Sequence, residues 1–491
     1  MAIIKLKRAR NSLLNVSKLP PEIFGEIFRY NATLTTCLGP LDEESHNFFL
    51  VCHYWFNVAS SILEIWSFWG YNLQDWTKRY LRHPTAPLNL TLDDAKFDFT
   101  NVTLDDSLRN ALQARAAQDT IRRIHLVARD SRILNSIISS LTGHEGVRSS
   151  SVEVVHLRFE NPRNPPIVSD FFAYHRFQKL RYLTLSHCII PSWDLKTSLL
   201  TRLQLDGRFP SSTITSPRIL SILRSNPLLQ DILLNGYAIP DDGVVESSRV
   251  PLAHLTKLIL DGRLRDVFML LLQLDCPGRM DFLSLGLTDG RVEDIPGVVG
   301  PYLRDYVRRR GRSQNGLSFS LASDNPIELW IGDTEAVSLP VPEFFRTFAE
   351  IYIELGQDLS GEGSLDLIAC VPREEVTYFE THGFPISMEA ISTQFPSLKG
   401  VRFSRTHLHV AFPESNLDRD KIPSSLQHIR LDMWTVNGVQ RSDWNLLANF
   451  LDRLASSGNR LGELCFRGSC DVDPDVEERF ARAVREFSIL D

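Results

Sequence analysis

A short apolar pattern recurs through most of this chain and constrains its fold more than any other feature. An apolar residue is followed three positions later by a second apolar residue, and two positions after that by a third. The clearest copies are residues 180–185 (Leu-x-x-Leu-x-Leu) and 398–403 (Leu-x-x-Val-x-Phe). Alternating apolar positions are typical of a strand with one buried face. Further copies begin at Ile121, Val152, Leu200, Leu229, Leu255, Leu426 and Leu461.

The spacing of these copies predicts a repeat protein. Successive copies are separated by about 20 to 35 residues, which is the period of leucine-rich repeats. Each copy supplies one strand and a return segment, commonly a helix, and segments 217–223 and 444–451 fit such returns. One repeat cannot bury its own inner face, so the copies must stack. The expected fold class is α/β, an irregular solenoid of parallel strands with helical returns. The pattern is weakest between residues 291 and 385, where strand-like pieces stand near Leu329, Ile353 and Val376.

Two amphipathic helices are predicted before the repeats. Pro20 and Pro21 suit a first helical turn, whose amide groups have no partner within the helix. A loop is expected over Asn31–Asp42, and a second helix from about Glu43 to Ser60. Together the helices carry more large apolar side chains than so small a unit can bury by itself. The first helix has Ile23, Phe24, Ile27 and Phe28, and the second has Phe48, Cys52, Trp55 and Ala59.

The order of these residues resembles an F-box, the adaptor-docking module of Skp–cullin–F-box ubiquitin ligases. The likeness rests on Leu-Pro-Pro-Glu-Ile at 19–23, on Leu-Val-Cys-x-x-Trp at 50–55, and on Trp66, eleven residues after Trp55. With the repeats, the chain resembles the F-box proteins with leucine-rich repeats of mushroom-forming fungi. This resemblance implies a Skp-type adaptor, and through it a cullin, as partners. The implied adaptor-binding residues are Leu19, Pro20, Ile23, Ile27, Phe28, Val51, Cys52, Trp55 and Trp66.

These patterns divide the chain into four parts. We expect a basic helical segment at residues 1–17 and a small F-box-like helical domain at 18–70. Linker helices and the first strand of the array follow at 71–120, and the leucine-rich-repeat domain fills 121–491. In the repeats, a partner would lie along the strand face, at the variable positions between the inward-facing leucines. The candidate target-binding residues there are His125, Arg158, Thr184, Gln204, Arg402 and Arg430.

The composition and motifs of the sequence favour a binding protein over an enzyme. The formal net charge of −7 disfavours nucleic acid as a partner. The sequence has no run long enough to span a membrane and no signal-peptide core, and its seven cysteines form no CxxC pair. We therefore expect a cytoplasmic or nuclear protein with free thiols. The sequence has no Gly-x-Ser-x-Gly, HExxH, Walker or GxGxxG motif, and we expect no cofactor and no metal. His407-x-His409, expected on a strand, is the nearest approach to a metal pair.

Three functions compete at this point. The first is a substrate-recognition subunit of a Skp–cullin–F-box ubiquitin ligase, bridging the adaptor and an unknown protein target. The second is a leucine-rich-repeat scaffold without a ligase role. The third is a parallel β-helix enzyme acting on polysaccharide. The third is disfavoured because β-helix coils lack helical returns, and because no carboxylates stand at matching positions of successive coils.

Overall fold

The structure is a computed structural model, and its chain forms two compact units, Met1–Gly236 and Tyr237–Asp491. We call them unit 1 and unit 2 and describe each by itself. The structure describes residues 18–37, 53–61, 68–69, 88–93, 110, 112–114, 119–142, 151–160, 177–188, 197, 199–207, 216–236, 249–277, 280–287, 300–302, 304–305, 308–309, 317–322, 327–333, 349–355, 373–383, 386–404, 407–413, 422–432, 441–467 and 472–490.

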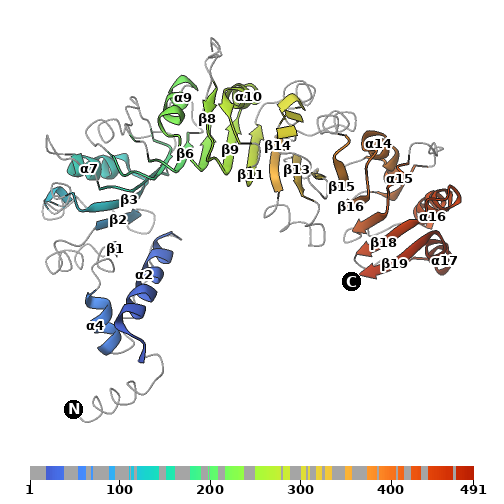
Figure 1. Ribbon diagram of the computed structural model, residues 1–491, viewed down its shortest axis with the longest axis horizontal. Helices are drawn as coiled ribbons and strands as arrows, with labels where there is room; N and C mark the ends of the chain where they lie inside the picture. The colour runs from blue at the N-terminus through green and yellow to red at the C-terminus, as the bar shows by residue number, and fades with distance from the viewer. Residues whose placement is uncertain are drawn as a thin grey trace. The chain divides into compact units, whose positions relative to one another are not determined.

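Unit 1 begins with two helices, α2 (Pro21–Cys37) and α4 (His53–Ser61) (Figure 1). The carbonyl of Pro20 accepts hydrogen bonds from the amides of Ile23 and Phe24, which starts α2 where the prolines predict. The loop expected from Asn31 is wrong, because α2 continues to Cys37. The reason is local: after Gly25, which α2 accommodates, the next helix-breaking residues are Gly39 and Pro40, beyond that point. The expected basic helix at 1–17 lies outside the described residues.

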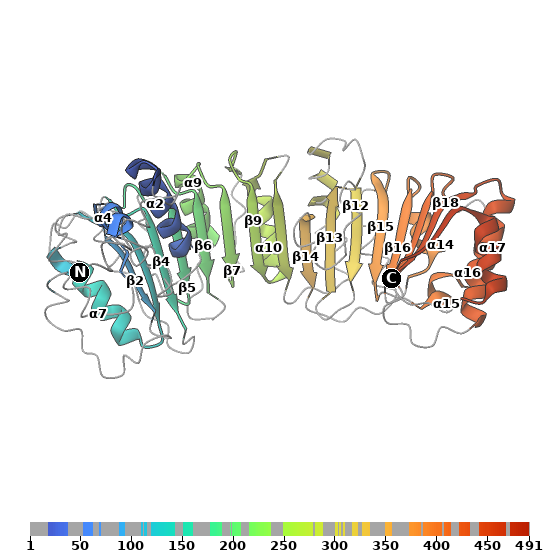
Figure 2. The same cartoon turned by 90° about the horizontal axis from the view of Figure 1, so that it is seen from below.

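The strands of unit 1 confirm the repeat pattern. Consecutive strands pair in parallel and in chain order from β1 to β7. Figure 2 shows several of them side by side. Phe68 and Trp69, expected in the helical domain, form the first strand. The strands are β1 (Phe68–Trp69), β2 (Leu88–Asp93), β3 (Ile121–Ala128), β4 (Val154–Phe159), β5 (Tyr182–Ser186), β6 (Arg202–Asp206) and β7 (Asp231–Asn235), and the helices between them include α7 (Ser131–Thr142) and α9 (Ser216–Ser225).

Alternate residues of each strand form the core of unit 1. Leu183 and Leu203 are fully buried, and Leu157 beside them on β4 is buried as well. Removing one such side chain from water stabilises the fold by about 1.5–3 kcal/mol. The register places Leu157, Leu185 and Leu205 in one row on successive strands, and Leu183 and Leu203 in a second row. The stacking expected from the period is therefore present.

Unit 2 continues the same architecture with one interruption. Its strands pair in the order β9, β11, β14, β13, β12, β15, β16, β17, β18 and β19, and β8 pairs with β10 in a separate small sheet. The bounds are β8 (Val250–Pro251), β9 (Lys257–Gly262), β10 (Leu274–Asp275), β11 (Phe282–Leu287), β12 (Leu317–Ala322), β13 (Ile327–Asp333), β14 (Ala349–Leu355), β15 (Val376–His382), β16 (Gly400–Ser404), β17 (His428–Asp432), β18 (Leu461–Arg467) and β19 (Val484–Leu490).

The interruption corrects the expectation of parallel strands throughout. Strands β12, β13 and β14 pair antiparallel, and this group joins β11 through β14 and β15 through β12. Only residues 323–326 connect β12 to β13. So short a link suits a hairpin, since a parallel crossover needs a dozen or more residues. The sequence pattern indicated β13 and β14 but missed β12.

Helices cover one face of the strands in unit 2 (Figure 1). On β18, Phe466 packs against Trp444 of α16 at 5.2 Å and against Phe480 of α17 at 5.6 Å between ring centroids. We call the opposite strand face the open face, in each unit. No helix in the described part of the chain has the length and apolar character that a bilayer crossing requires. The helices are α10 (Leu264–Leu272), α14 (Met388–Gln394), α15 (Leu408–Ala411), α16 (Arg441–Ser456) and α17 (Pro474–Ala483).

Candidate functional site

Helices α2 and α4 share a small aromatic core, and we call the pair the α2–α4 module. Phe24 and Phe28 of α2 are each only 1% exposed and pack with Val58 and Ala59 of α4. The ring centroid of Trp55 lies 5.0 Å from that of Phe24 and 5.4 Å from that of Phe28. These edge-to-face contacts hold the two helices together. The module therefore has an interior of its own.

A second apolar row lies on another side of α2. Ile23, Ile27 and Tyr30 are four and three positions apart, which places them on one helix face. Their exposed fractions are 48%, 47% and 68%. At about 100° per residue, the centre of this row lies roughly 110° around the helix from the centre of the Phe24–Phe28 row. We call these three residues the α2 stripe. The helix thus uses one apolar face for its core and leaves the other in water.

The residues implied by the F-box resemblance are divided between these two faces. Ile23 and Ile27 belong to the α2 stripe, and Pro20 beside them is exposed. Phe28 lies in the core, so it supports the surface without forming it. Leu19 and Trp55 are partly buried against that core, and the Tyr54 hydroxyl donates to the Leu19 carbonyl at 3.1 Å. Val51, Cys52 and Trp66 lie outside the described residues.

The candidate target-binding residues of unit 1 lie on its open face. His125 on β3, Thr184 on β5 and Gln204 on β6 occupy one row across the strands. Arg158 is in the neighbouring row, where Ser186 is its register partner. The alternation of strand side chains places all four opposite the leucine core. The structure therefore brings them to one surface.

Sequence reasoning missed His156, which completes this row between His125 and Thr184. The rings of His125 and His156 stack with centroids 4.2 Å apart. Burial, together with the smaller effects of the nearby charges of His125, Arg158 and Arg202, lowers the pKa of His156 to about 3. The ring is therefore neutral at physiological pH. The signal that could have found His156 is its position, because it stands in the 152–157 copy where His125 stands in the 121–126 copy.

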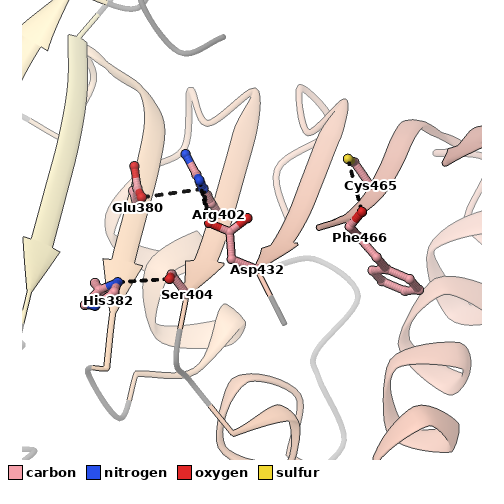
Figure 3. A network of polar contacts seen from close by, with 7 residues as sticks. All are labelled: Glu380, His382, Arg402, Ser404, Asp432, Cys465 and Phe466. Carbon is pink, nitrogen blue, oxygen red and sulfur yellow. Dashed lines mark hydrogen bonds and ion pairs between the residues drawn. The ribbon is translucent and has the colours of Figure 1, made fainter. Parts of the chain in front are cut away.

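The open face of unit 2 holds a buried ionic network (Figure 3). Arg402 on β16 donates from Nε to Asp432 Oδ2 on β17 at 2.9 Å and makes a second hydrogen bond to the same oxygen. Its Nε also lies 3.5 Å from Glu380 Oε1 on β15. The exposed fractions of Glu380, Arg402 and Asp432 are 1%, 2% and 7%. We call these three residues the ionic triad.

Burial governs the ionisation of the triad. It raises the pKa of Glu380 to about 7, and the positive charge of Arg402 opposes that rise only in part. For Arg402, burial favours the neutral form, but Glu380 and Asp432 together raise its pKa above the ordinary value. Two carboxyl groups thus share one guanidinium. Glu380 therefore titrates near neutral pH.

Smaller polar pairs surround the triad on the same face. His428 Nδ1 lies 3.2 Å from Glu463 Oε2, and His382 Nδ1 lies 2.9 Å from Ser404 Oγ. At Gly400, a Cβ atom would stand 2.6 Å from the ring of Tyr378, so the ring lies against this glycine. A larger residue there would displace the tyrosine.

The sequence pointed to only part of this cluster. Arg402 and Arg430 were candidates because each stands between two apolar positions of a clear repeat copy. In the structure they are register partners. Asp432 was missed although it follows Arg430 by two residues, the spacing of one strand face. Glu380 was missed because it lies in the region where the pattern is weakest. In both cases the pairing of strands, not the local sequence, makes the contact.

Reactive and metal-binding groups are not gathered at this face. Among the described residues, no group of three or more His, Cys, Asp or Glu side chains could hold a metal ion. His407 and His409 are not on a strand as expected: His407 caps α15 and His409 lies within it. Cys188 and Cys276 are free and buried, and burial raises the pKa of each thiol to about 12. Such thiols are inert.

Comparisons with known proteins add little to this geometry. No family model matches the chain, and no curated protein sequence matches it. A chain in the solved structure of a TLR13–ssRNA13 complex is similar over 76% of this chain and 55% of that one, with 13% sequence identity and a TM-score of 0.24. The chain thus spans just over half the length of that neighbour. At this TM-score the similarity carries no weight, and the fold assignment rests on the strand pairing.

Replacing Arg402 tests the structural role of the triad. We expect Arg402→Met to lower the free energy of unfolding by about 3–5 kcal/mol, because it leaves two buried carboxyl groups without their shared cation. Urea denaturation followed by circular dichroism measures this loss. Arg430→Met, the same substitution at the register partner, should cost no more than about 1 kcal/mol. Equal losses from the two substitutions would contradict the assignment.

The pKa of Glu380 predicts a pH dependence of stability. Because the folded-state pKa is raised to about 7 from an ordinary value of 4.5, the folded protein holds an extra proton between these pH values. The stabilising contribution is complete below pH 4.5 and is lost as the pH rises to 7, by up to about 3 kcal/mol. The unfolding free energy of the wild type minus that of Glu380→Gln should therefore decrease from pH 5 to pH 8. A difference that stays constant with pH would show that Glu380 does not titrate in this range.

Proposed function

We propose that the chain is an F-box-type substrate-recognition subunit of a Skp–cullin–F-box ubiquitin ligase. In this proposal the α2–α4 module docks a Skp-type adaptor, and through it a cullin, while the open strand faces hold a target protein. The chain contributes proximity between the target and the transfer machinery, not chemistry of its own. Such a role places it in the cytoplasm or the nucleus.

The α2 stripe is the observation that carries this proposal. Ile23 and Ile27 are about half exposed although α2 already buries Phe24 and Phe28 in the module core. Covering one isoleucine side chain stabilises a complex by about 1.5–3 kcal/mol at most. An apolar row beside a completed core is typical of a helix that packs against another protein. It also coincides with the positions that the F-box resemblance implies.

The open faces support the second half of the proposal. Both carry polar and charged rows that the strand register aligns, including His125 and Thr184 in unit 1 and Arg430 in unit 2. Repeat proteins commonly use such extended strand surfaces to bind partners. A leucine-rich-repeat scaffold without a ligase role fits these faces equally well. The two functions differ only in whether the α2 stripe binds an adaptor.

Adaptor binding separates these functions directly. The full chain should comigrate with a purified Skp-type adaptor in gel filtration, and Ile23→Asp with Ile27→Asp should abolish the comigration. Each aspartate would lose the apolar contact of the isoleucine, and its carboxylate would have to be desolvated in the complex. The affinity for the adaptor should therefore fall at least about tenfold per site. Both positions are exposed, so circular dichroism and thermal unfolding should stay as in the wild type.

The choice of positions matters for this test. Trp55 packs on Phe24 and Phe28, so Trp55→Ala would loosen the module itself and confuse folding with binding. Glu22→Gln is a suitable control, because Glu22 is exposed on α2 and is rotated by about 100° from Ile23. This control should bind as the wild type does. If the wild type fails to comigrate with the adaptor, the scaffold function stands and the ligase role is rejected.

A further inference from the structure

Strand β19 of unit 2 has an edge that can accept a neighbouring strand. β18 pairs with β17 on one side and with β19 on the other, and β18 is the one strand in the described part of the chain that pairs with β19 (Figure 1). The outer edge of such a strand presents a row of unpaired amide and carbonyl groups. Proline, lysine and bulges commonly block an edge of this kind. β19 contains no proline and no lysine, and it pairs with β18 in one continuous register.

Apolar side chains of β19 are less covered than their counterparts on the preceding strands. The register sets Ile489 beside Phe466 of β18, which stands beside Leu431 of β17. Phe466 and Leu431 are 0% and 1% exposed, whereas Ile489 in the same row is 41% exposed. Leu490, which alternation places on the opposite face, is 43% exposed. An apolar row that reaches an open edge is covered when a further strand extends the sheet.

Contacts at the start and the centre of β19 hold this edge in place. The guanidinium of Arg460 donates two hydrogen bonds to the Val484 carbonyl, at 3.1 Å from Nε and at 2.7 Å from Nη2. Phe487 packs against Phe466 and Phe480, with ring centroids 5.4 Å and 5.8 Å apart. The strand is therefore already ordered, and pairing along its outer edge requires little further loss of conformational entropy.

We propose that β19 pairs antiparallel with β19 of a second copy of this chain. With Phe487 opposite its own counterpart at a two-fold axis, all seven residues of the strand are paired. Arg485 then stands opposite Ile489 of the second copy, and Glu486 stands opposite Ser488. No two like charges are directly opposite each other, an arrangement that favours pairing. A shift by two residues in either direction shortens the pairing, and in one direction it also sets two glutamates opposite each other.

The two-fold axis makes this contact self-complementary. Every side-chain pair across the edge occurs twice, so the contact closes at two copies and a substitution in β19 acts at two places. The exposed apolar side chain of Ile489 would be covered by the aliphatic part of the Arg485 side chain of the second copy. This inference goes beyond adaptor docking and target binding, and it depends on neither.

Charge substitutions at Ile489 test the pairing in the full chain. Sedimentation equilibrium should show the wild type as a dimer, with twice the mass of the chain, at micromolar concentrations. Ile489→Lys sets a cation opposite Arg485 of the second copy, whereas Ile489→Glu sets an anion there. Because the contact occurs twice, the glutamate variant should dimerise at least about tenfold more tightly than the lysine variant. Thermal unfolding of each variant checks that the chain is folded.

The same two substitutions in an Arg485→Glu background identify the register. There the order should reverse, so that Ile489→Lys dimerises more tightly than Ile489→Glu. Within one chain, positions 485 and 489 are about 13 Å apart along the strand. A reversal therefore requires that the two positions meet between copies.

Three outcomes would overturn the proposal. The first is a wild type that stays monomeric throughout the micromolar range, and the second is an order of the two variants that is the same in both backgrounds. The third is growth into assemblies larger than two copies, which a closed two-fold contact does not allow. Ile489→Lys should still comigrate with the adaptor, because β19 belongs to unit 2 and the α2 stripe to unit 1. Failure of this test is therefore distinguishable from failure of the ligase role.

Discussion

The register of the parallel strands is the constraint on which the rest of the structure depends. Hydrogen bonds between neighbouring strands fix which residues stand side by side, and the alternation of side chains then assigns every second residue to the helix-covered face. Leu157, Leu185 and Leu205 form one buried row by this rule. The same rule aligns His125, His156 and Thr184 in a row on the open face. Because the leucine row is buried on the helix-covered face, the His125 row must lie on the open face.

The ionic triad shows what this constraint permits on the open face. The three members of the triad come from three neighbouring strands. They meet because the register sets Glu380 beside Arg402 in one row and places Asp432 in the next. Burying charges is costly, and a buried ion pair often contributes little net stability compared with apolar side chains of similar size. Once the charges are buried, however, each depends on the others. The triad therefore ties β15, β16 and β17 to one register.

The sequence predicted the parts of the fold that depend on periodicity. The copies at 121–126, 180–185 and 426–431 correspond to strands β3, β5 and β17. Apolar residues at alternate positions can all be buried together only in a strand with one buried face. Strand β12 and its antiparallel pairing with β13 were missed. Leu317, Phe319 and Leu321 alternate, but Gly316 stands where a repeat copy has its first apolar residue, and the antiparallel pairing follows from the short connection. Contacts such as Arg402 with Asp432 join residues 30 positions apart. They follow from strand pairing, which the local sequence does not show.

The same separation of faces explains what could be predicted for the α2–α4 module. The sequence showed an apolar excess, but it could not assign Phe28 to the core and Ile27 to the surface, because both belong to one wide apolar stripe. That division is made by α4, whose Val58 and Ala59 cover Phe24 and Phe28 and do not cover Ile27. Among the described residues, α4 is the helix that packs against α2, and so short a helix covers only one of its faces. The α2 stripe is thus a geometric consequence of the module's small size, and its exposure in water is the reason to expect that another protein covers it.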